Sequence, residues 1–362
     1  MLSEVHASSA KFRTERSAEM ILACDVTANC AVIELFDAAL NRPYSRTALY
    51  GVRITAENTA ETLRRLSVTA MRSAGVPSSA VKGAAIAASV FVSNRLEEEL
   101  SAADLGLDPE TELVFVPYIS MALSGRFTAT LLTIPNGNFL VADLGANICI
   151  GEKNGETLRC AGFPLSGAFD GTALESGMPC ENGAIDAVRS ENGIIEYEVV
   201  GDGDSLGISP AGAVCASRIM LSEGVIDSDG IMTDRDLFAI GEDFFISQSD
   251  IRAIQSDKAK CAAAFELFGT EKPYLSGAPF SNDYGFRAMT AIGAVPEKYL
   301  KASFCGNSVI RGAENFLLSE KYREEAYEIV KNTEDISERL AEEFDGKYLE
   351  RLSFEKKIDK FC

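Results

Sequence analysis

The sequence predicts an α/β protein made of two similar lobes, and three observations lead to this fold class. The chain has 362 residues, whereas one hydrophobic core usually serves roughly 100 to 200 residues. Hydrophobic residues make up 46% of the chain, which allows a sizeable core and argues against a disordered chain. An apolar run that ends in an aspartate, followed by a turn and a second apolar run, occurs twice. We therefore expect a duplicated architecture.

The first copy of this pattern occupies residues 20–36. An apolar run ends at Asp25, residues 27–29 form a short polar break, and the apolar residues resume at Ala31. Apolar runs separated by turn-forming residues are typical of a β-hairpin. The pattern predicts two strands with Asp25 at the tip, and residues 46–54 are expected to add a third strand.

A helix is expected to follow the third strand. Residues 55–76 carry apolar side chains at helical spacing, and Gly75 supplies the residue type that most often ends a helix. Asn58 or Thr59 is expected to be the N-cap, because a short polar side chain can accept a hydrogen bond from the free amides of the first turn. The apolar residues 81–92 then predict a buried strand.

The same order returns in the second half of the chain. Residues 139–150 predict a hairpin in which Asp143 ends the first apolar run. Helices are expected at 211–223 and 248–268, followed by a strand at 272–277 that ends in a glycine turn. The repeat predicts two lobes, each with a hairpin, a third strand and covering helices.

The repeat also suggests where the lobes divide. We expect a first lobe over 1–138, including an N-terminal leader, and a second lobe over 139–362 that ends in a charged helical tail. The leader has mixed charge and no apolar centre of the kind that a secretory signal requires. His6, the one histidine of the chain, lies in this leader, so histidine-based catalysis is not expected.

Charge and cysteine content exclude several classes of function. A formal net charge of −20 repels nucleic acid and anionic lipid, and the sequence shows no basic patch. No apolar run approaches the roughly 20 residues that span a bilayer. The nine cysteines are scattered without a CxxC pair, which argues against a disulfide framework, a zinc site or an iron–sulfur cluster. A soluble protein of the reducing cytoplasm is expected, and the sequence leaves a homodimer open.

The two aspartates suggest a nucleotide site. Amides in two such turns can point at phosphate oxygens, while Asp25 and Asp143 hold magnesium through its water molecules. ATP with magnesium is the ligand that this arrangement suits. Aspartate also ends strands for ordinary turn reasons, so the pair by itself is equally compatible with two structural turns.

A resemblance to a known family makes the prediction more specific. Several segments resemble, in order, the large C-terminal domain of the reductive activators of corrinoid proteins. These segments are 160–188, 207–230, 246–267, 273–280, 291–300, 306–313 and the ending DISERLAEEFDGKYLERLSF. The resemblance extends over residues 19–354 and is strongest after residue 139.

The resemblance implies the actin-like ATPase (ASKHA) fold, with two ribonuclease H-like lobes. Members of that family use ATP to drive one-electron reduction of an inactive cobalt cofactor on a partner corrinoid protein. Their iron–sulfur module is a separate segment, and the cysteine spacing leads us to expect that this chain carries no such cluster.

The resemblance also implies a set of nucleotide-binding residues. They are Asp25 and Thr27 in the first phosphate turn, Asp143, Gly145 and Asn147 in the second, Gly212 at a helix start, Gly277 in the adenosine turn, and Lys258, which could reach an adenine. The alternative for Lys258 is an ordinary solvated helix lysine. No catalytic residue is assigned.

Departures from the family pattern weaken the expected nucleotide site. Thr27 replaces a glycine, and a β-branched residue is poorly suited to a positive φ or to a close approach of backbone to phosphate. Cys149 replaces an acidic residue of the second turn, and Pro279 removes an amide donor from the adenosine turn. We therefore expect weakened or lost ATP binding.

Three hypotheses about function follow from these observations. The first is a stand-alone relative of the activators that binds a corrinoid protein or its methyltransferase system. The second is a metal-dependent ATP-binding or ATP-hydrolysing protein with an atypical phosphate site. The third is a degenerate actin-like protein that binds another small ligand between its lobes.

Overall fold

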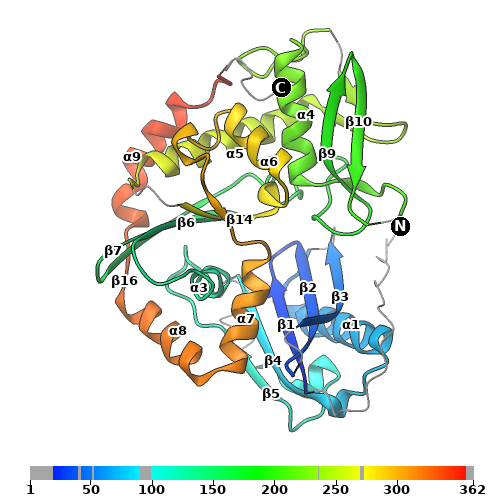
Figure 1. Cartoon of the computed structure of the whole chain (residues 1–362), viewed down its shortest axis with the longest axis vertical. Helices are drawn as coiled ribbons and strands as arrows, with labels where there is room; N and C mark the ends of the chain where they lie inside the picture. The colour runs from blue at the N-terminus through cyan, green and yellow to red at the C-terminus, as the bar shows by residue number, and fades with distance from the viewer. Residues whose placement is uncertain are drawn as a thin grey trace. The chain divides into compact units, whose positions relative to one another are not determined.

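The structure is a computed structural model that describes residues 19–39, 42–50, 53–89, 99–201, 203–234, 236–269 and 273–355. The predicted leader with His6 lies outside these residues. Contacts within the chain define two compact units (Figure 1). Unit 1 comprises Met1–Pro135 and Asn307–Thr333, and unit 2 comprises Asn136–Gly306 and Glu334–Cys362. The sequence led us to expect all residues after 139 in the second lobe, but residues 307–333 pack in unit 1.

Unit 1 is built on a five-stranded sheet with the order β3-β2-β1-β4-β5. The strands are β1 (Met20–Val26), β2 (Cys30–Asp37), β3 (Arg42–Tyr50), β4 (Val81–Ala88) and β5 (Glu112–Phe115). The first three pair antiparallel, and β4 and β5 continue the sheet parallel to β1. The predicted hairpin is confirmed, whereas the third strand includes Arg42, four residues before its expected start, and residues 51–52 of the expected strand lie outside the described residues.

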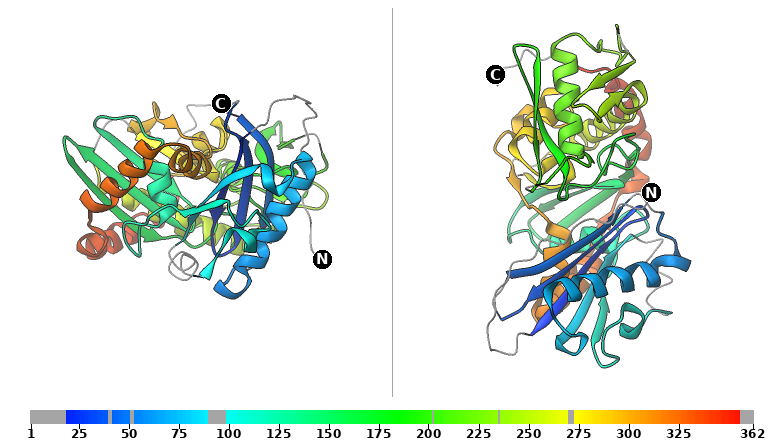
Figure 2. Two further views of the ribbon diagram at one scale, coloured as in Figure 1. Left: turned by 90° about the horizontal axis from the view of Figure 1, so that it is seen from below. Right: turned by 90° about the vertical axis from the view of Figure 1, so that its right-hand side faces the viewer.

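Helices cover both faces of this sheet. Helix α1 (Ala56–Ala74) packs on one face, against β2 and β3 (Figure 2). Helices α3 (Gly125–Leu131), α7 (Ser308–Leu318) and α8 (Glu320–Asn332) lie on the other side of the core. Successive residues of a strand point to opposite faces, so alternate residues of β1 enter two separate apolar clusters. Residues 307–333 join unit 1 because they supply the apolar cover for this second face.

Helix α1 begins after a different N-cap from the two that were predicted, and it ends at the predicted glycine. The N-cap is Thr55, not Asn58 or Thr59. Asn58 lies three residues inside and its side-chain oxygen accepts a hydrogen bond from the Thr55 amide at 2.8 Å, so it reaches back to the cap residue. Gly75 ends the helix with a φ of 68°, as predicted.

Unit 2 repeats the same sheet and adds one edge strand. Its order is β15-β14-β6-β7-β8-β16. The strands are β6 (Phe139–Leu144), β7 (Asn147–Asn154), β8 (Thr157–Pro164), β14 (Pro273–Gly277), β15 (Ser303–Phe304) and β16 (Thr333–Asp335). Strands β6, β7 and β8 pair antiparallel, and β14 and β15 run parallel to β6. Reading from the third strand, both units have the order third, second, first, then two parallel strands, which confirms the duplicated fold.

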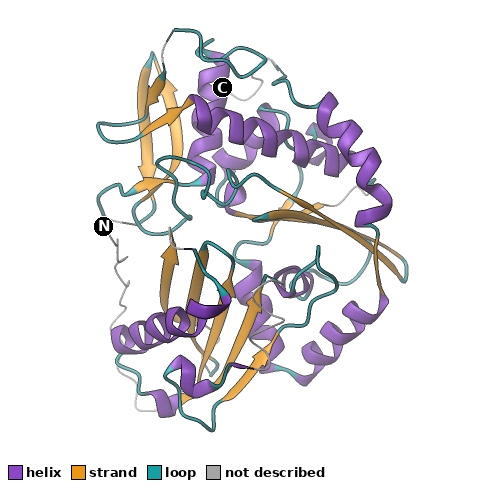
Figure 3. Cartoon of the chain, turned by 180° about the vertical axis from the view of Figure 1, so that it is seen from behind, coloured by secondary structure: helices purple, strands orange, loops and turns teal. Residues whose placement is uncertain are grey.

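The helices of unit 2 pack around this sheet (Figure 3). They are α4 (Pro210–Ser222), α5 (Gln248–Glu266), α6 (Asp283–Ala291) and α9 (Ser337–Glu350). Short sheets join β9 (Ala184–Glu191), β10 (Ile194–Val199) and β11 (Gly207–Ile208), and β12 (Leu237–Ala239) with β13 (Phe245–Ser247). Helices α4 and α5 match the two helices predicted after the second hairpin. Within the residues that the structure describes, no helix has the length and apolar character needed to cross a membrane.

Candidate functional site

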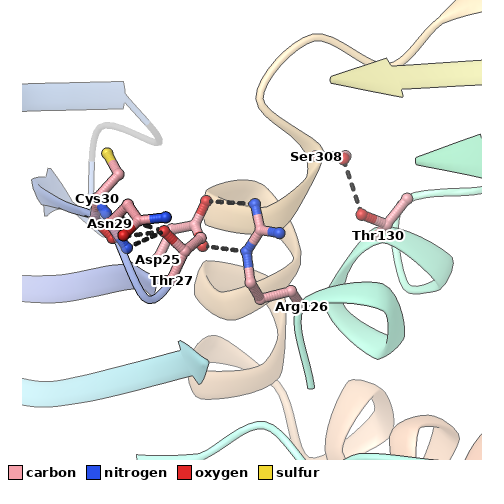
Figure 4. Close-up of polar contacts among 7 residues, drawn as sticks. All are labelled: Asp25, Thr27, Asn29, Cys30, Arg126, Thr130 and Ser308. Carbon is pink, nitrogen blue, oxygen red and sulfur yellow. Dashed lines mark hydrogen bonds and ion pairs between the residues drawn. The ribbon is translucent and has the colours of Figure 1, made fainter. Parts of the chain in front are cut away.

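The first turn of unit 1, between β1 and β2, is closed by the side chain of Thr27 (Figure 4). The Thr27 hydroxyl accepts hydrogen bonds from the amide of Cys30 at 2.9 Å and from the amide of Asn29 at 3.3 Å. The same hydroxyl is 3.1 Å from the carbonyl oxygen of Cys30, to which it can donate. The amide of Thr27 donates to that carbonyl at 2.8 Å.

This closure changes what the turn offers to a ligand. Three of its amides, those of Thr27, Asn29 and Cys30, already donate within the turn. Neither Thr27 nor Asn29 has a positive φ, so the turn avoids the backbone conformation that only glycine adopts at low cost. Thr27 therefore closes the turn without glycine, by means of its own hydroxyl.

Asp25, at the end of β1, forms an ion pair with Arg126 of α3 (Figure 4). Nε of Arg126 donates to Oδ1 at 2.5 Å, and Nη2 donates to Oδ2 at 3.1 Å. The side chain of Asp25 is 14% exposed and that of Arg126 is 16% exposed, so solvent screens the ion pair only partly. Two parallel bonds to one carboxylate are the strongest geometry available to an arginine and an acid.

Close packing of the backbone fixes the position of α3 and thus of Arg126. A Cβ on Gly125 would lie 2.3 Å from the carbonyl oxygen of Val116, and a Cβ on Gly312 of α7 would lie 1.9 Å from the carbonyl oxygen of Ala129. Both distances are too short for any side chain, so these glycines let α3 approach its neighbours. The hydroxyls of Thr130 and Ser308 share a hydrogen bond of 2.9 Å between α3 and α7 (Figure 4).

Asp25 does not fit the predicted magnesium site in this arrangement. Magnesium is held by carboxylate oxygens, usually through several of its own waters, in near-octahedral geometry. Both carboxylate oxygens of Asp25 instead accept hydrogen bonds from the guanidinium of Arg126. A hydrated cation that binds Asp25 would therefore compete with that guanidinium for the carboxylate.

The turn of unit 2, between β6 and β7, has a more conventional form. The amide of Gly145 donates to the carbonyl of Asn147 at 3.0 Å. Asp143 is 5% exposed and lies opposite Cys149 in the hairpin. The hairpin thus brings three predicted residues, Asp143, Gly145 and Asn147, to one tip.

Cysteines lie close to Asp143. Cys149 faces it across the hairpin, at the position where the family pattern has an acidic residue. Burial, together with the nearby charge of Asp143, raises the pKa of the Cys305 thiol to about 11. Cys305 is therefore a neutral thiol at physiological pH. Among the described residues, no group of three or more histidines, cysteines or carboxylates could hold a metal ion.

Two of the three glycines predicted in unit 2, Gly212 and Gly277, are needed for close packing. A Cβ on Gly212 would lie 2.2 Å from the carbonyl oxygen of Ile185, where α4 crosses β9. A Cβ on Gly277 would lie 2.3 Å from the carbonyl oxygen of Leu144, and the φ of Gly277 is 118°. These contacts explain both glycines without a ligand, although Gly277 also places the predicted adenosine turn beside the end of β6.

A polar network around Asp186, which was not predicted from the sequence, connects the starts of α4 and α6. The carboxylate of Asp186 accepts hydrogen bonds from the hydroxyl of Ser209 at 2.6 Å, from the hydroxyl of Ser281 at 2.9 Å and from the side-chain amide of Asn282 at 2.6 Å. Ser209 and Asn282 are the N-caps of the two helices. One carboxylate therefore holds both cap side chains in place.

Lys258 of α5 is buried, so its reading as a solvated lysine is wrong. It is 1% exposed, and its ammonium group donates to the carbonyl oxygens of Arg351 and Ser353, just beyond the end of α9. The ammonium also lies 5.4 Å from the centre of the Phe354 ring. Cations bind favourably at the carbonyl end of a helix, so Lys258 anchors the C-terminal segment. Contact with an adenine stays a prediction.

Sequence reasoning missed the two residues that most change the site, Arg126 and Asp186. Arg126 is 101 residues from Asp25 in the chain, and it stands in a short helix that was not predicted. Asp186 stands within β9, where an acidic residue among the apolar residues at the start of the strand, Ala184–Val188, was the available signal. The structure brings Asp25 and Thr27 together in unit 1, and Asp143, Gly145 and Asn147 together in unit 2.

Comparison with known proteins identifies relatives of the chain. The family model for the C-terminal domain of RACo, the ASKHA domain, matches residues 137–361. The corrinoid activation enzyme RamQ of Eubacterium limosum is 28% identical over 256 residues, which cover 60% of this chain and 43% of RamQ. The chain therefore spans less than half the length of that relative.

A solved structure has the same fold. A reductive activator for a corrinoid, iron–sulfur protein superposes with a TM-score of 0.80 at 19% sequence identity, covering 94% of this chain and 67% of the activator. The actin-like α/β fold and the resemblance to corrinoid activators are both confirmed. The chain belongs to the family of the C-terminal ASKHA domain of RACo.

Proposed function

We propose that the chain acts in corrinoid activation by binding a corrinoid protein or its methyltransferase system, with weakened or lost binding of ATP. Family membership over residues 137–361 is the observation that carries the first half of this proposal. RamQ, which shares 28% of its residues with the chain over the matched region, is a corrinoid activation enzyme. A related surface in this chain would accept a related partner.

The geometry of unit 1 supports the second half of the proposal. Amides that bind phosphate must be free to point at it, but the amides of Thr27, Asn29 and Cys30 donate within their own turn. The carboxylate of Asp25 is neutralised by Arg126. A triphosphate would gain few new hydrogen bonds here and would have to break existing ones.

Partner binding is tested by titrating the purified chain with a purified corrinoid protein in a calorimeter. We expect a complex that forms at micromolar concentrations and that does not form with an unrelated protein of similar negative charge. Repeating the titration with the purified methyltransferase shows which of the two proteins binds the chain. Absence of a complex with either protein at tens of micromolar contradicts the proposal.

Nucleotide binding is tested separately, with ATP and magnesium. We expect neither heat nor a shift in thermal unfolding at ATP concentrations that saturate ordinary members of the fold. Binding that requires magnesium and disappears in Asp143→Ala would instead support the second hypothesis, a metal-dependent ATP-binding protein. Asp204→Ala, a change at an exposed carboxylate of unit 2, is the matched control for the loss of one negative charge.

A further inference from the structure

The ion pair between Asp25 and Arg126 suggests why unit 1 departs from the chemistry expected of it. We propose that the guanidinium of Arg126 is a permanent counter-ion that takes the place of a divalent cation at Asp25. Unit 1 then carries no cation site at its first turn, whatever the metal concentration. The inference concerns a metal site and is independent of partner binding, so either proposal can fail without the other.

The geometry of the pair carries the first step. A guanidinium that donates to both oxygens of one carboxylate satisfies that carboxylate as a cation would, in charge and in direction. A magnesium ion entering the same place would meet the positive charge of Arg126 at short range and would compete with the guanidinium for the two carboxylate oxygens. At such distances the repulsion between like charges is substantial even in a polar medium.

The second step is that Arg126 is held rigidly on the protein. Its helix is pressed against its neighbours at Gly125 and at Gly312, where no Cβ could fit. The hydrogen bond between Thr130 and Ser308 joins the same helix to α7. The planar guanidinium is pre-organised for two hydrogen bonds, so Arg126 loses little conformational entropy when it pairs with Asp25. This favours the guanidinium over an ion from solution.

The third step concerns the turn itself. Thr27 closes the turn that follows Asp25 with its own hydroxyl and amide. Arg126 neutralises the carboxylate, and the amides of Thr27, Asn29 and Cys30 donate within the turn, so few groups here are left to contact a metal-bound phosphate. The Asp25–Arg126 ion pair and the closure of the turn by Thr27 both disfavour a cation at this turn.

The test uses Mn²⁺ alone as a paramagnetic probe, followed by amide NMR signals of the full chain. Bound Mn²⁺ broadens the signals of nearby amides, so residues 24–30 report on the surroundings of Asp25, and comparison with Asp25→Asn shows whether a broadening comes from Asp25 or from another carboxylate nearby. We expect no selective broadening of these amides in the wild-type protein. In Arg126→Gln, which keeps a polar side chain but removes the charge, we expect selective broadening of the same signals.

Two further variants separate charge from folding. Arg126→Lys keeps a positive charge and should resemble the wild type, whereas Asp25→Asn combined with Arg126→Gln should lose the broadening again. Unchanged dispersion of the remaining signals shows that each variant is folded. The proposal is overturned if wild-type residues 24–30 broaden and Asp25→Asn abolishes this, or if folded Arg126→Gln shows no selective broadening. Should Arg126→Gln not fold, the wild-type and Asp25→Asn measurements decide the question by themselves.

Discussion

The two hairpin turns that begin the two units have the same place in the same topology but are built differently. In unit 1, a threonine hydroxyl closes the turn and an arginine neutralises the preceding aspartate. In unit 2, Gly145 bonds along the backbone to Asn147, and Asp143 is buried near two cysteines. A turn that lacks glycine can thus be completed by a side-chain oxygen, and its fold survives although its amides are no longer offered to a ligand.

The largest expected effect lies beside the turn of unit 2. Gly277→Ala places a Cβ against the carbonyl oxygen of Leu144 and forces a φ of 118° on a residue with a side chain. We expect the free energy of unfolding to fall by about 3 kcal/mol, as measured by urea denaturation. Gly193→Ala is the control, because its φ is also positive but nothing lies within 4 Å of its Cβ; it should cost about 1 kcal/mol. Equal losses in the two variants would show that the contact with Leu144 is unimportant.

The ion pair of unit 1 gives the next effect. Arg126→Ala leaves Asp25 largely buried without its guanidinium, so we expect a loss of about 2 to 3 kcal/mol in unfolding free energy. A double-mutant cycle with Asp25→Ala isolates the interaction between the two side chains. A coupling energy near zero would mean that the pair is no stronger than an exposed one, and the contrast between the two turns would lose its electrostatic part.

Thr27→Val should have a smaller effect. The substitution preserves the β-branched shape but removes the oxygen that accepts from Asn29 and Cys30. We expect a loss of about 1 to 2 kcal/mol and faster hydrogen exchange at those two amides. Thr27→Ser, which keeps the hydroxyl, should restore most of the protection. If valine leaves exchange unchanged, the hydroxyl does not close the turn.

The pH dependence of unit 1 provides a fourth test. Burial, with the neighbouring charge of Glu34, raises the pKa of Glu314 on α7 from 4.5 to about 8. Between these values the folded state binds a proton that the unfolded state has released, so stability falls as the pH rises from about 4.5 to about 8. Glu314→Gln should flatten this part of the profile of Tm against pH, and an unchanged slope would contradict the assignment.

The sequence predicted the repeated parts of the fold well, because they depend on local patterns. Both hairpins and the helices α1, α4 and α5 follow from hydrophobic periodicity and glycine positions. The N-cap of α1 was placed three or four residues too late. Thr55 and Asn58 both have side chains that can cap a helix, and the backbone conformation of Thr55 decides between them. The start of β3 was predicted four residues too late because the first half of the strand, around Pro43, has little apolar alternation.

The site was predicted less well, because its decisive contacts join residues far apart in the chain. Asp25 was recognised by its position at a strand end, but no local pattern pairs it with Arg126. Lys258 looked like a surface residue because its burial depends on carbonyl groups about 93 to 95 positions later. Thr27 was expected to damage the turn, and the structure shows that it builds one.

The return of residues 307–333 to unit 1 has a consequence for how the protein is made. During synthesis the strands of the first sheet leave the ribosome early, but two of the three helices that cover one of its faces, α7 and α8, are added only after nearly all of unit 2. Until then much of that apolar face is exposed and open to aggregation or to chaperones. Unit 2 can assemble most of its sheet during this interval. A gene fragment that stops before residue 307 would encode a first unit without its cover, so the two units cannot be separated by a single cut in the chain.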